Sequence, residues 1–188
     1  MEMEESNIIR NLKKGKNIAL ETIVKEYGNK VYNLIVKLIS DKEDAKDLTQ
    51  EVFIRIYNNI ELFKGNSSFY TWIYSIAVNC SKDYWRKKKE TYSLDAMKDV
   101  FYSNNKTEDI AEKNELRAII ISEIYKLDAD QKEAVILRDI MGFSYSEISE
   151  ILSISQGTVK SRISRGRHKL RSCLQNLNDH RGGNKDGS

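Results

Sequence analysis

Apolar residues recur along most of this chain at intervals of three and four positions, the spacing of one face of an α-helix. A first stripe consists of Val31, Leu34, Ile35, Leu38 and Ile39. A second consists of Ala45, Leu48, Val52 and Ile56. Asp41 lies between the two stripes, where it can cap the second helix. The sequence also contains no proline, so we expect an all-α protein.

The strongest helical pattern follows a short polar loop, Gly65 to Ser68. Its apolar stripe comprises Phe69, Trp72, Ile73, Ile76, Ala77, Cys80 and Tyr84. The opposite face carries Asn79, Lys82 and Arg86 at positions i, i+3 and i+7, so one amide and two cations project together. Together these helices predict a first small domain over residues 16–89.

The next segment loses this periodicity and is acidic. Residues 90–115 carry seven Asp or Glu against three Lys. We interpret residues 90–114 as an acidic linker between two domains.

Helical periodicity resumes at Leu116 and continues to Gly142, a natural helix stop. The pattern therefore predicts a second small helical domain over residues 115–175. Beyond it, the chain from Asn178 onward has no apolar residue. We expect residues 176–188 to form a disordered tail.

The second domain contains two short helices joined by a tight turn. Ser144 and Glu147 form a capping-box pattern at the start of the first helix, Tyr145 to Leu152. Ser155 can cap the second helix, and a turn this short predicts helix-turn-helix geometry. The inner side of the second helix carries Val159, Ile163, Gly166 and Leu170. Its outer side carries Lys160, Ser161, Ser164, Arg165 and His168.

Such an outer face suits the major groove of DNA, because Arg and Lys donate to guanine O6 and N7. We expect base contacts from Lys160, Ser161, Ser164 and Arg165. Contacts to the phosphate backbone are expected from Arg162, Arg167, Lys169 and Arg171. Two other readings stay open for this segment: a helix-turn-helix can serve only as a packing unit, and a basic amphipathic helix can bind a membrane or RNA.

Charge is segregated along the chain, although the net charge is only +3. Residues 64–89 carry six Lys or Arg against one acid, and residues 156–171 carry six Lys or Arg and no acid. A basic block on each domain favours a polyanionic partner.

Cys80 and Cys173 lie in no CxxC or Cys/His cluster, so we expect buried, reduced thiols and no metal or other cofactor. The longest apolar runs fall short of eighteen residues, and the first ten residues lack the pattern of a secretion signal. A soluble, cytoplasmic protein without membrane insertion is expected.

Three segments resemble the sigma-70 family of bacterial RNA polymerase sigma factors. DQKEAVILRDIMGFSYSEISEILSISQGTVKSRISRGRHKL resembles the domain that reads the promoter -35 element. DAKDLTQEVFIRIY is similar to the polymerase-binding helix, and FYTWIYSIAVNCSKDYWRKKK to the -10 recognition helix. The absence of a globular domain between them resembles the extracytoplasmic-function (ECF) subgroup. One departure is Leu127-Asp128, where proline commonly follows leucine; we expect Asp128 to cap the helix instead.

The resemblance implies promoter-specific transcription initiation without catalysis by the chain itself. Its partners would be core RNA polymerase, promoter DNA in duplex and single-stranded form, and an anti-sigma factor, while the linker would thread the RNA exit channel. The implied polymerase contacts are Asp47, Gln50, Glu51 and Arg55. Those implied for capture of the opened -10 strand are Gly65, Asn66, Ser67, Ser68, Tyr70, Tyr74, Asn79, Lys82 and Arg86. Those implied for the -35 element are Lys160, Ser161, Arg162, Ser164, Arg165, Arg167, His168 and Lys169.

Two alternatives stay open, one from the same binding class and one from the class of enzymes. A helix-turn-helix activator or repressor would bind duplex DNA without polymerase. A nuclease would use Asp44, Asp47 and Glu51 with a metal ion, although the sequence shows no second carboxylate or histidine cluster to complete that site.

Overall fold

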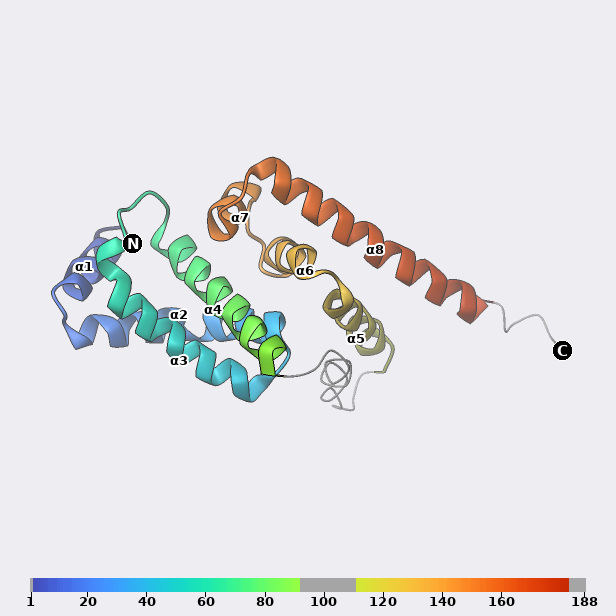
Figure 1. Ribbon diagram of the computed structural model, residues 1–188, viewed down its shortest axis with the longest axis horizontal. Coiled ribbons are helices and arrows are strands. Elements are labelled where there is room, and N and C mark those ends of the chain that lie inside the picture. The colour runs from blue at the N-terminus through green and yellow to red at the C-terminus, as the bar shows by residue number, and fades with distance from the viewer. Residues whose placement is uncertain (1, 92–110, 183–188) are drawn as a thin grey trace.

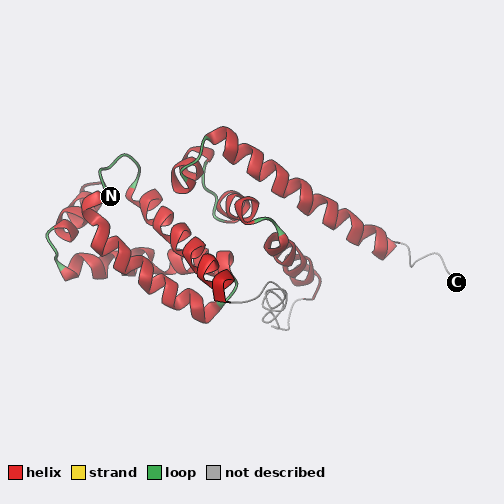
Figure 2. Cartoon of the chain, in the orientation of Figure 1, coloured by secondary structure: helices red, strands yellow, loops and turns green. Residues whose placement is uncertain are grey.

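The computed structural model describes residues 2–91 and 111–182, and every regular element in these two ranges is helical (Figures 1 and 2). The all-α prediction is confirmed. The first range contains α1 (Glu2–Lys13), α2 (Asn17–Ile39), α3 (Lys42–Asn59), the short 3-10 helix η1 (Ile60–Leu62) and α4 (Phe69–Thr91). The second contains α5 (Ala111–Lys126), α6 (Ala129–Val135), the π-helical turn η3 (Ile136–Ile140), α7 (Tyr145–Leu152) and α8 (Gln156–Gly182).

In the first domain, α2, α3 and α4 pack against one another through their apolar stripes. All five residues of the first predicted stripe are buried, and in the second only Leu48 is half-buried. The predicted cap is confirmed, because the Asp41 carboxylate accepts hydrogen bonds from the backbone N–H groups of Glu43 and Asp44, at 2.9 and 3.0 Å.

Helix α1 was not predicted and extends the first domain toward the N-terminus. Leu12 is buried in the core, and the Lys13 ammonium donates to the carbonyl oxygen of Phe63 at 3.0 Å. The domain therefore begins before residue 16. The periodicity did not reveal this helix because only Ile8, Ile9 and Leu12 form its inner side, a stripe too short to stand out.

The second domain packs α6 and α7 against α8. Gly142 has φ +80° and ends the helical segment, as predicted. Asp128 occupies the N-cap position of α6, but its side chain makes no capping hydrogen bond. The carboxylate instead accepts from the Lys169 ammonium at 2.7 Å, so the capping prediction was wrong.

The expected tail is partly helical, since α8 continues to Gly182. Most of the predicted linker lies outside the described residues, and residues 111–114 belong to α5. Both cysteines are free; Cys80 is buried as expected, whereas Cys173 is only half-buried because it borders an open groove between α5 and α8.

Helix α4 contacts both domains: α2 and α3 pack against its predicted apolar stripe, and α7 lies against another side (Figure 1). Tyr74 and Val78, which were not in that stripe, are fully buried. Trp72 and Ile76, which were in it, are half-buried. The difference arises because the second domain covers a face that local periodicity marks as exposed.

Candidate functional site

The helix-turn-helix is built from the caps that the sequence predicts. The Glu147 N–H donates to the Ser144 hydroxyl at 3.2 Å, and the Ser144 N–H donates to the Glu147 carboxylate at 2.8 Å, which completes the capping box. Ser153 takes the left-handed conformation, with φ 54°, and ends α7. The Ser155 hydroxyl then accepts from the Thr158 N–H at 3.1 Å and starts α8. Both predicted caps are confirmed.

Helix α8 has two distinct faces. Val159, Ile163 and Gly166 are buried against the preceding helices, and Leu170 is half-buried. A Cβ atom built on Gly166 would lie only 2.7 Å from Cγ2 of Val135, so α8 and α6 approach closely at this point. Lys160, Ser161, Ser164, Arg165 and His168 are all exposed on the outer face, as the sequence predicts.

Three of the predicted phosphate-contacting residues form ion pairs that tie α8 to the helices before it. The Arg162 guanidinium pairs with Asp130 at 2.6 Å. The Lys169 ammonium pairs with Asp128 at 2.7 Å, and this contact lowers the pKa of the Asp128 carboxyl. Arg167 donates to both carboxylate oxygens of Asp139. The sequence analysis did not identify these acids, because their partners lie about 30 to 40 positions away in the chain.

The loop before α4 combines an exposed backbone turn with a helix cap. Gly65 has φ +76° and open space around its α-carbon, and Asn66 is exposed. Ser67 is half-buried. The Ser68 hydroxyl accepts from the Thr71 N–H at 3.0 Å, so this side chain begins the helix.

Asn79, Lys82 and Arg86 share the predicted face of α4; Asn79 and Arg86 are exposed, whereas Lys82 is half-buried against the second domain. Asn79 is exposed at the edge of a shallow pocket of about 260 Å³. This pocket is lined by Arg55, Asn59, Leu62, Trp72, Ser75, Ile76 and Asn79. Lys82 pairs with Glu133 of α6 at 3.3 Å, and Arg86 pairs with Asp83 at 3.0 Å. An amide, an indole and two cations thus border one surface.

Tyr70 and Tyr74 lie on a different side of α4, beneath the second domain. The Tyr70 hydroxyl donates to that of Tyr74 at 3.1 Å. The ring of Phe143 lies 5.4 Å from the Tyr70 ring and 4.9 Å from the Tyr74 ring, measured between centroids. Tyr74 is fully buried, so in this structure its side chain is not accessible for the contact to the -10 strand that the resemblance implies.

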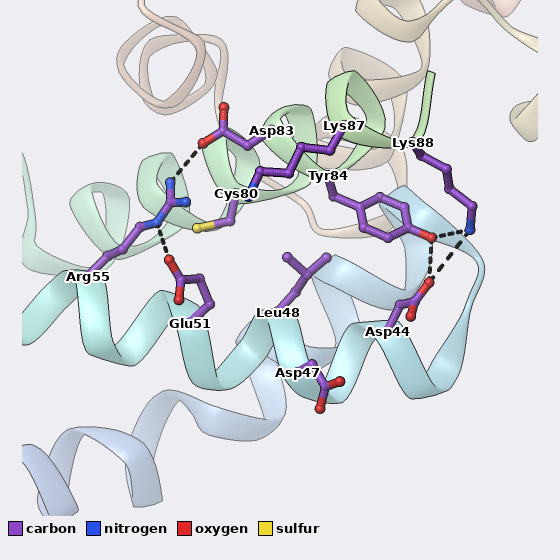
Figure 3. A pocket seen from close by; sticks show the side chains of 10 residues that line it. All are labelled: Asp44, Asp47, Leu48, Glu51, Arg55, Cys80, Asp83, Tyr84, Lys87 and Lys88. Carbon is purple, nitrogen blue, oxygen red and sulfur yellow. Dashed lines mark hydrogen bonds and ion pairs between the residues drawn. The ribbon is translucent and has the colours of Figure 1, made fainter. Parts of the chain in front are cut away.

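A larger pocket of about 570 Å³ lies between α3 and α4 and includes most of the predicted polymerase contacts (Figure 3). It is lined by Asp44, Asp47, Leu48, Glu51, Arg55, Cys80, Asp83, Tyr84, Lys87 and Lys88. Of the four predicted residues, Asp47, Glu51 and Arg55 line it, and Gln50 is exposed one position before Glu51.

Arg55 is held between the two helices that form this pocket. Its guanidinium donates to Glu51 at 2.8 Å and to Asp83 at 2.9 Å (Figure 3). These hydrogen bonds, foremost the one to Glu51, raise the pKa of Arg55. Its hydrogen bond in turn lowers the pKa of Asp83. The family resemblance implied that Arg55 contacts polymerase, but nothing in the sequence identified Asp83 as its partner.

A second polar cluster closes the other end of the pocket. The Tyr84 hydroxyl donates to Asp44 at 2.6 Å, and the Lys88 ammonium lies 3.6 Å from the same carboxylate (Figure 3). The Cys80 thiol also faces this pocket, and burial raises its pKa to about 11. The thiol is therefore protonated near neutral pH and unreactive.

Among the described side chains, no three His, Cys, Asp or Glu residues are grouped as metal ligands would be. Within the same parts of the chain, none of the helices is long and apolar enough to cross a bilayer.

Comparison with known proteins gives a consistent family. Residues 23–91 match Sigma-70 region 2, and residues 117–170 match Sigma-70, region 4. The chain is 38% identical over 187 residues to the ECF RNA polymerase sigma factor SigW of Bacillus subtilis, covering 94% of this chain and 100% of that protein. It is 32% identical over 186 residues to the ECF RNA polymerase sigma-E factor of Escherichia coli K12, covering 94% and 97%.

Two solved structures share the fold. One is CnrH in complex with the cytosolic domain of CnrY, with a TM-score of 0.67, 23% identity, and coverage of 91% of this chain and 97% of that one. The other is the sigma factor RpoE in complex with the anti-sigma factor NepR from Bartonella quintana, with a TM-score of 0.64, 24% identity, and coverage of 82% and 96%. With two matched sigma-70 regions and close relatives over nearly its whole length, the chain belongs to the sigma-70 family as an ECF RNA polymerase sigma factor.

Proposed function

We propose that this sigma factor selects promoters through two separate DNA surfaces and a third surface for polymerase. The outer face of α8 reads the duplex -35 element. The outer side of α4 and the loop before it capture the opened -10 strand. The observation that carries this proposal is the outer face of α8, which is exposed and cationic. This helix belongs to a helix-turn-helix whose two helices are both capped, and it packs closely against α6.

The proposed -35 surface consists of Lys160, Ser161, Ser164, Arg165 and His168. Arg165 donates to the Ser161 carbonyl oxygen on its own helix at 3.3 Å. Moving the guanidinium to a guanine therefore breaks no contact between helices, which makes Arg165 the best candidate for bidentate base reading. Arg162, Arg167 and Lys169 form ion pairs with acids of the same domain. We infer that these three mainly fix the orientation of α8 and contact phosphates secondarily.

The proposed -10 surface must bind a single strand better than a duplex, because each extruded base costs a few kcal/mol. Asn79 offers donor and acceptor groups for a Watson-Crick edge at the rim of the small pocket. Lys82 and Arg86 lie one and two turns further along α4, where they can hold the backbone. The loop residues Gly65 to Ser68 supply a wall with little side-chain bulk.

The proposed polymerase surface is the outer side of α3, with Asp47 and Gln50 exposed to a partner. Glu51 and Arg55 are already fixed, because Arg55 donates hydrogen bonds to Glu51 and to Asp83. This fixing lowers the entropy that those side chains lose on binding. Asp47 and Gln50 would then supply most new contacts with polymerase. Glu51 and Arg55 would supply shape and charge complementarity.

Two further parts of the proposal concern partners and location. The similar proteins CnrH and RpoE were solved as complexes, the latter with an anti-sigma factor. We infer that an anti-sigma factor also binds this chain, and that the chain acts in the cytoplasm, where polymerase is found. The acidic linker, residues 90–114, stays a prediction: it would occupy the RNA exit channel until growing RNA displaces it.

Run-off transcription with core polymerase tests the two DNA surfaces separately. Arg165→Ala should reduce discrimination among -35 variants by roughly 5- to 150-fold, the equivalent of about 1–3 kcal/mol. Asn79→Ala should reduce discrimination among -10 variants and leave -35 preference unchanged. Arg10→Ala and Asn29→Ala are matched controls, because both positions are exposed and lie on α1 and α2, outside the proposed surfaces. Unchanged promoter preference in both test variants would contradict the assignments.

A further inference from the structure

One acidic residue stands within the basic block of the first domain, and the proposed DNA surface does not explain it. Over residues 64–89, Asp83 is the single acid among six Lys or Arg. It lies between Lys82 and Arg86, two residues of the proposed -10 surface. A carboxylate beside these cations repels DNA phosphates and so opposes strand binding. The contacts of Asp83 therefore have to indicate another role.

Each oxygen of the Asp83 carboxylate accepts a hydrogen bond from a different arginine. Oδ2 accepts from Nη1 of Arg55, on α3, at 2.9 Å (Figure 3). Oδ1 accepts from Nη2 of Arg86, on α4, at 3.0 Å. Arg55 belongs to the proposed polymerase surface, whereas Arg86 belongs to the proposed -10 surface. The two surfaces thus share one carboxylate.

The two arginines differ in how firmly they are held. The side chains of Arg55 and Asp83 are 32% and 29% exposed, and Arg55 also donates to Glu51 at 2.8 Å. The Arg86 side chain is 68% exposed. Arg55 foremost, and Arg86 with it, lower the pKa of Asp83, so the carboxylate is ionised near neutral pH. Because ion pairs in solvent are weak, a DNA phosphate can replace Asp83 as the partner of Arg86 while Arg55 stays in place.

We propose that Asp83 is a positioning residue, which holds Arg55 in place for core polymerase, and that Arg86 competes for it until a phosphate of the -10 strand takes Arg86. From then on Asp83 serves Arg55 alone and holds its guanidinium more firmly. Capture of the strand thus strengthens the grip on polymerase, and by linkage polymerase binding strengthens capture of the strand. The inference rests on the proposed function, because it uses the roles given there to Arg55 and Arg86.

Electrostatics sets the direction of this coupling. Two guanidinium groups on one carboxylate repel each other, and each weakens the attraction of Asp83 for the other. A phosphate neutralises the charge of Arg86, and its own charge repels Asp83 toward Arg55. An ion pair that is partly exposed contributes enough to change an affinity by about two- to fivefold, which is the size of effect expected here.

The first test measures the affinity of the full chain for fluorescently labelled core polymerase, without DNA. Arg86→Gln should bind about two- to fivefold more tightly than wild type, because it removes the competitor for Asp83. Asp83→Asn should bind more weakly by a similar factor. Lys89→Gln is the matched control, since it removes an exposed cation of the same helix six positions from Asp83, and it should bind as wild type does.

A double variant then asks whether the gain acts through Asp83. In an Asp83→Asn background, Arg86→Gln should no longer raise the affinity for polymerase. An ion pair that only stabilised α4 would give the opposite first result, because its loss would weaken polymerase binding or leave it unchanged. The inference is overturned if Arg86→Gln binds no more tightly than wild type, or if the gain is equally large in the Asp83→Asn background.

The coupling to DNA is measured with the same labelled polymerase. The probe is a single-stranded oligonucleotide with the non-template -10 sequence of a promoter found by run-off transcription. Adding it should raise the affinity of the wild-type chain for polymerase, and Asp83→Asn should lose about two- to fivefold of that gain. A gain of equal size in wild type and Asp83→Asn would refute the coupling.

Arg55→Gln separates this inference from the proposed polymerase surface. We expect it to bind polymerase more weakly than wild type. Unchanged affinity in Arg55→Gln would refute the polymerase role of Arg55, and the inference with it. Weaker binding by Arg55→Gln, combined with no gain in Arg86→Gln, would refute the role of Asp83 and leave the polymerase surface standing. Thermal unfolding of each variant confirms that the affinities compare folded proteins.

Discussion

Gly166 offers a sharp test of how the -35 surface is supported, because replacing it with alanine sets two effects against each other. Alanine in place of glycine inside a helix stabilises by about 1 kcal/mol. The added methyl group, however, would lie 2.7 Å from Cγ2 of Val135, and 3.5 Å from both Cβ of Gln131 and Cδ1 of Leu127. Overpacking of this kind costs about 1–3 kcal/mol.

The upper part of this range of overpacking costs applies here, because the Val135 side chain cannot easily move aside. It is buried, lies at the last position of a helix, and has a stiff β-branched side chain. Relief requires α6 and α8 to move apart. Subtracting the helix preference leaves a net loss of roughly 1–2 kcal/mol in the free energy of unfolding of the second domain.

The assay is urea unfolding followed by far-ultraviolet circular dichroism. Trp72 is surrounded by first-domain residues, so its fluorescence in a Trp85→Phe background identifies the first-domain transition, and the remaining transition belongs to the second. Gly157→Ala is the matched control on the same helix: the nearest atom to its added methyl is the Ser155 hydroxyl at 3.8 Å, so this variant should be neutral or more stable.

A Val135→Ala background completes the test. There Gly166→Ala should no longer destabilise, which corresponds to a coupling free energy of at least about 1 kcal/mol between the two positions. Stabilisation by Gly166→Ala in the wild-type chain, or a coupling near zero, would refute the close approach of α6 and α8.

Two other predictions concern single interactions. Ser144→Ala removes the hydroxyl that caps α7 and should lower the free energy of unfolding of the second domain by about 0.5–2 kcal/mol in urea; no change would contradict the capping box. Asp83→Asn should lower the free energy of unfolding of the first domain by about 1 kcal/mol near pH 7. Arg55 lowers the pKa of Asp83 in the folded state. The stabilisation by this ion pair is therefore present above pH 3.8, the pKa of Asp83 in the unfolded chain, and is lost as the pH falls through the folded-state pKa. The difference between wild type and variant should therefore shrink in acid; a difference independent of pH would contradict the Arg55 contact.

Sequence reasoning succeeded where local chemistry decides the structure. Hydrophobic periodicity located α2, α3, α4 and α8, because each buries one stripe against its own domain. The caps at Asp41, Ser144 and Ser155 were predicted from residue type and spacing, and the short turn identified the helix-turn-helix. These features depend on residues within four positions of one another.

It failed where the deciding partner is distant in sequence. Tyr74 has the spacing of an outward residue, yet Phe143 of the other domain covers it. The sequence predicted Asp128 as a helix cap, yet its carboxylate pairs with the ammonium of Lys169, 41 positions further along the chain. The candidate site shows the same division: the resemblance implied a role for Arg55, whereas its partner Asp83 became evident only once α3 and α4 were packed together.

The central claim is that this chain directs core polymerase to promoters by binding alone. Run-off transcription on genomic fragments, with core polymerase in the presence and absence of the chain, tests it most directly. We expect discrete transcripts only when the chain is present, and weak specific DNA binding by the chain without polymerase. Transcription unaffected by the chain, together with tight binding of the free chain to a defined duplex site, would instead identify a conventional activator or repressor.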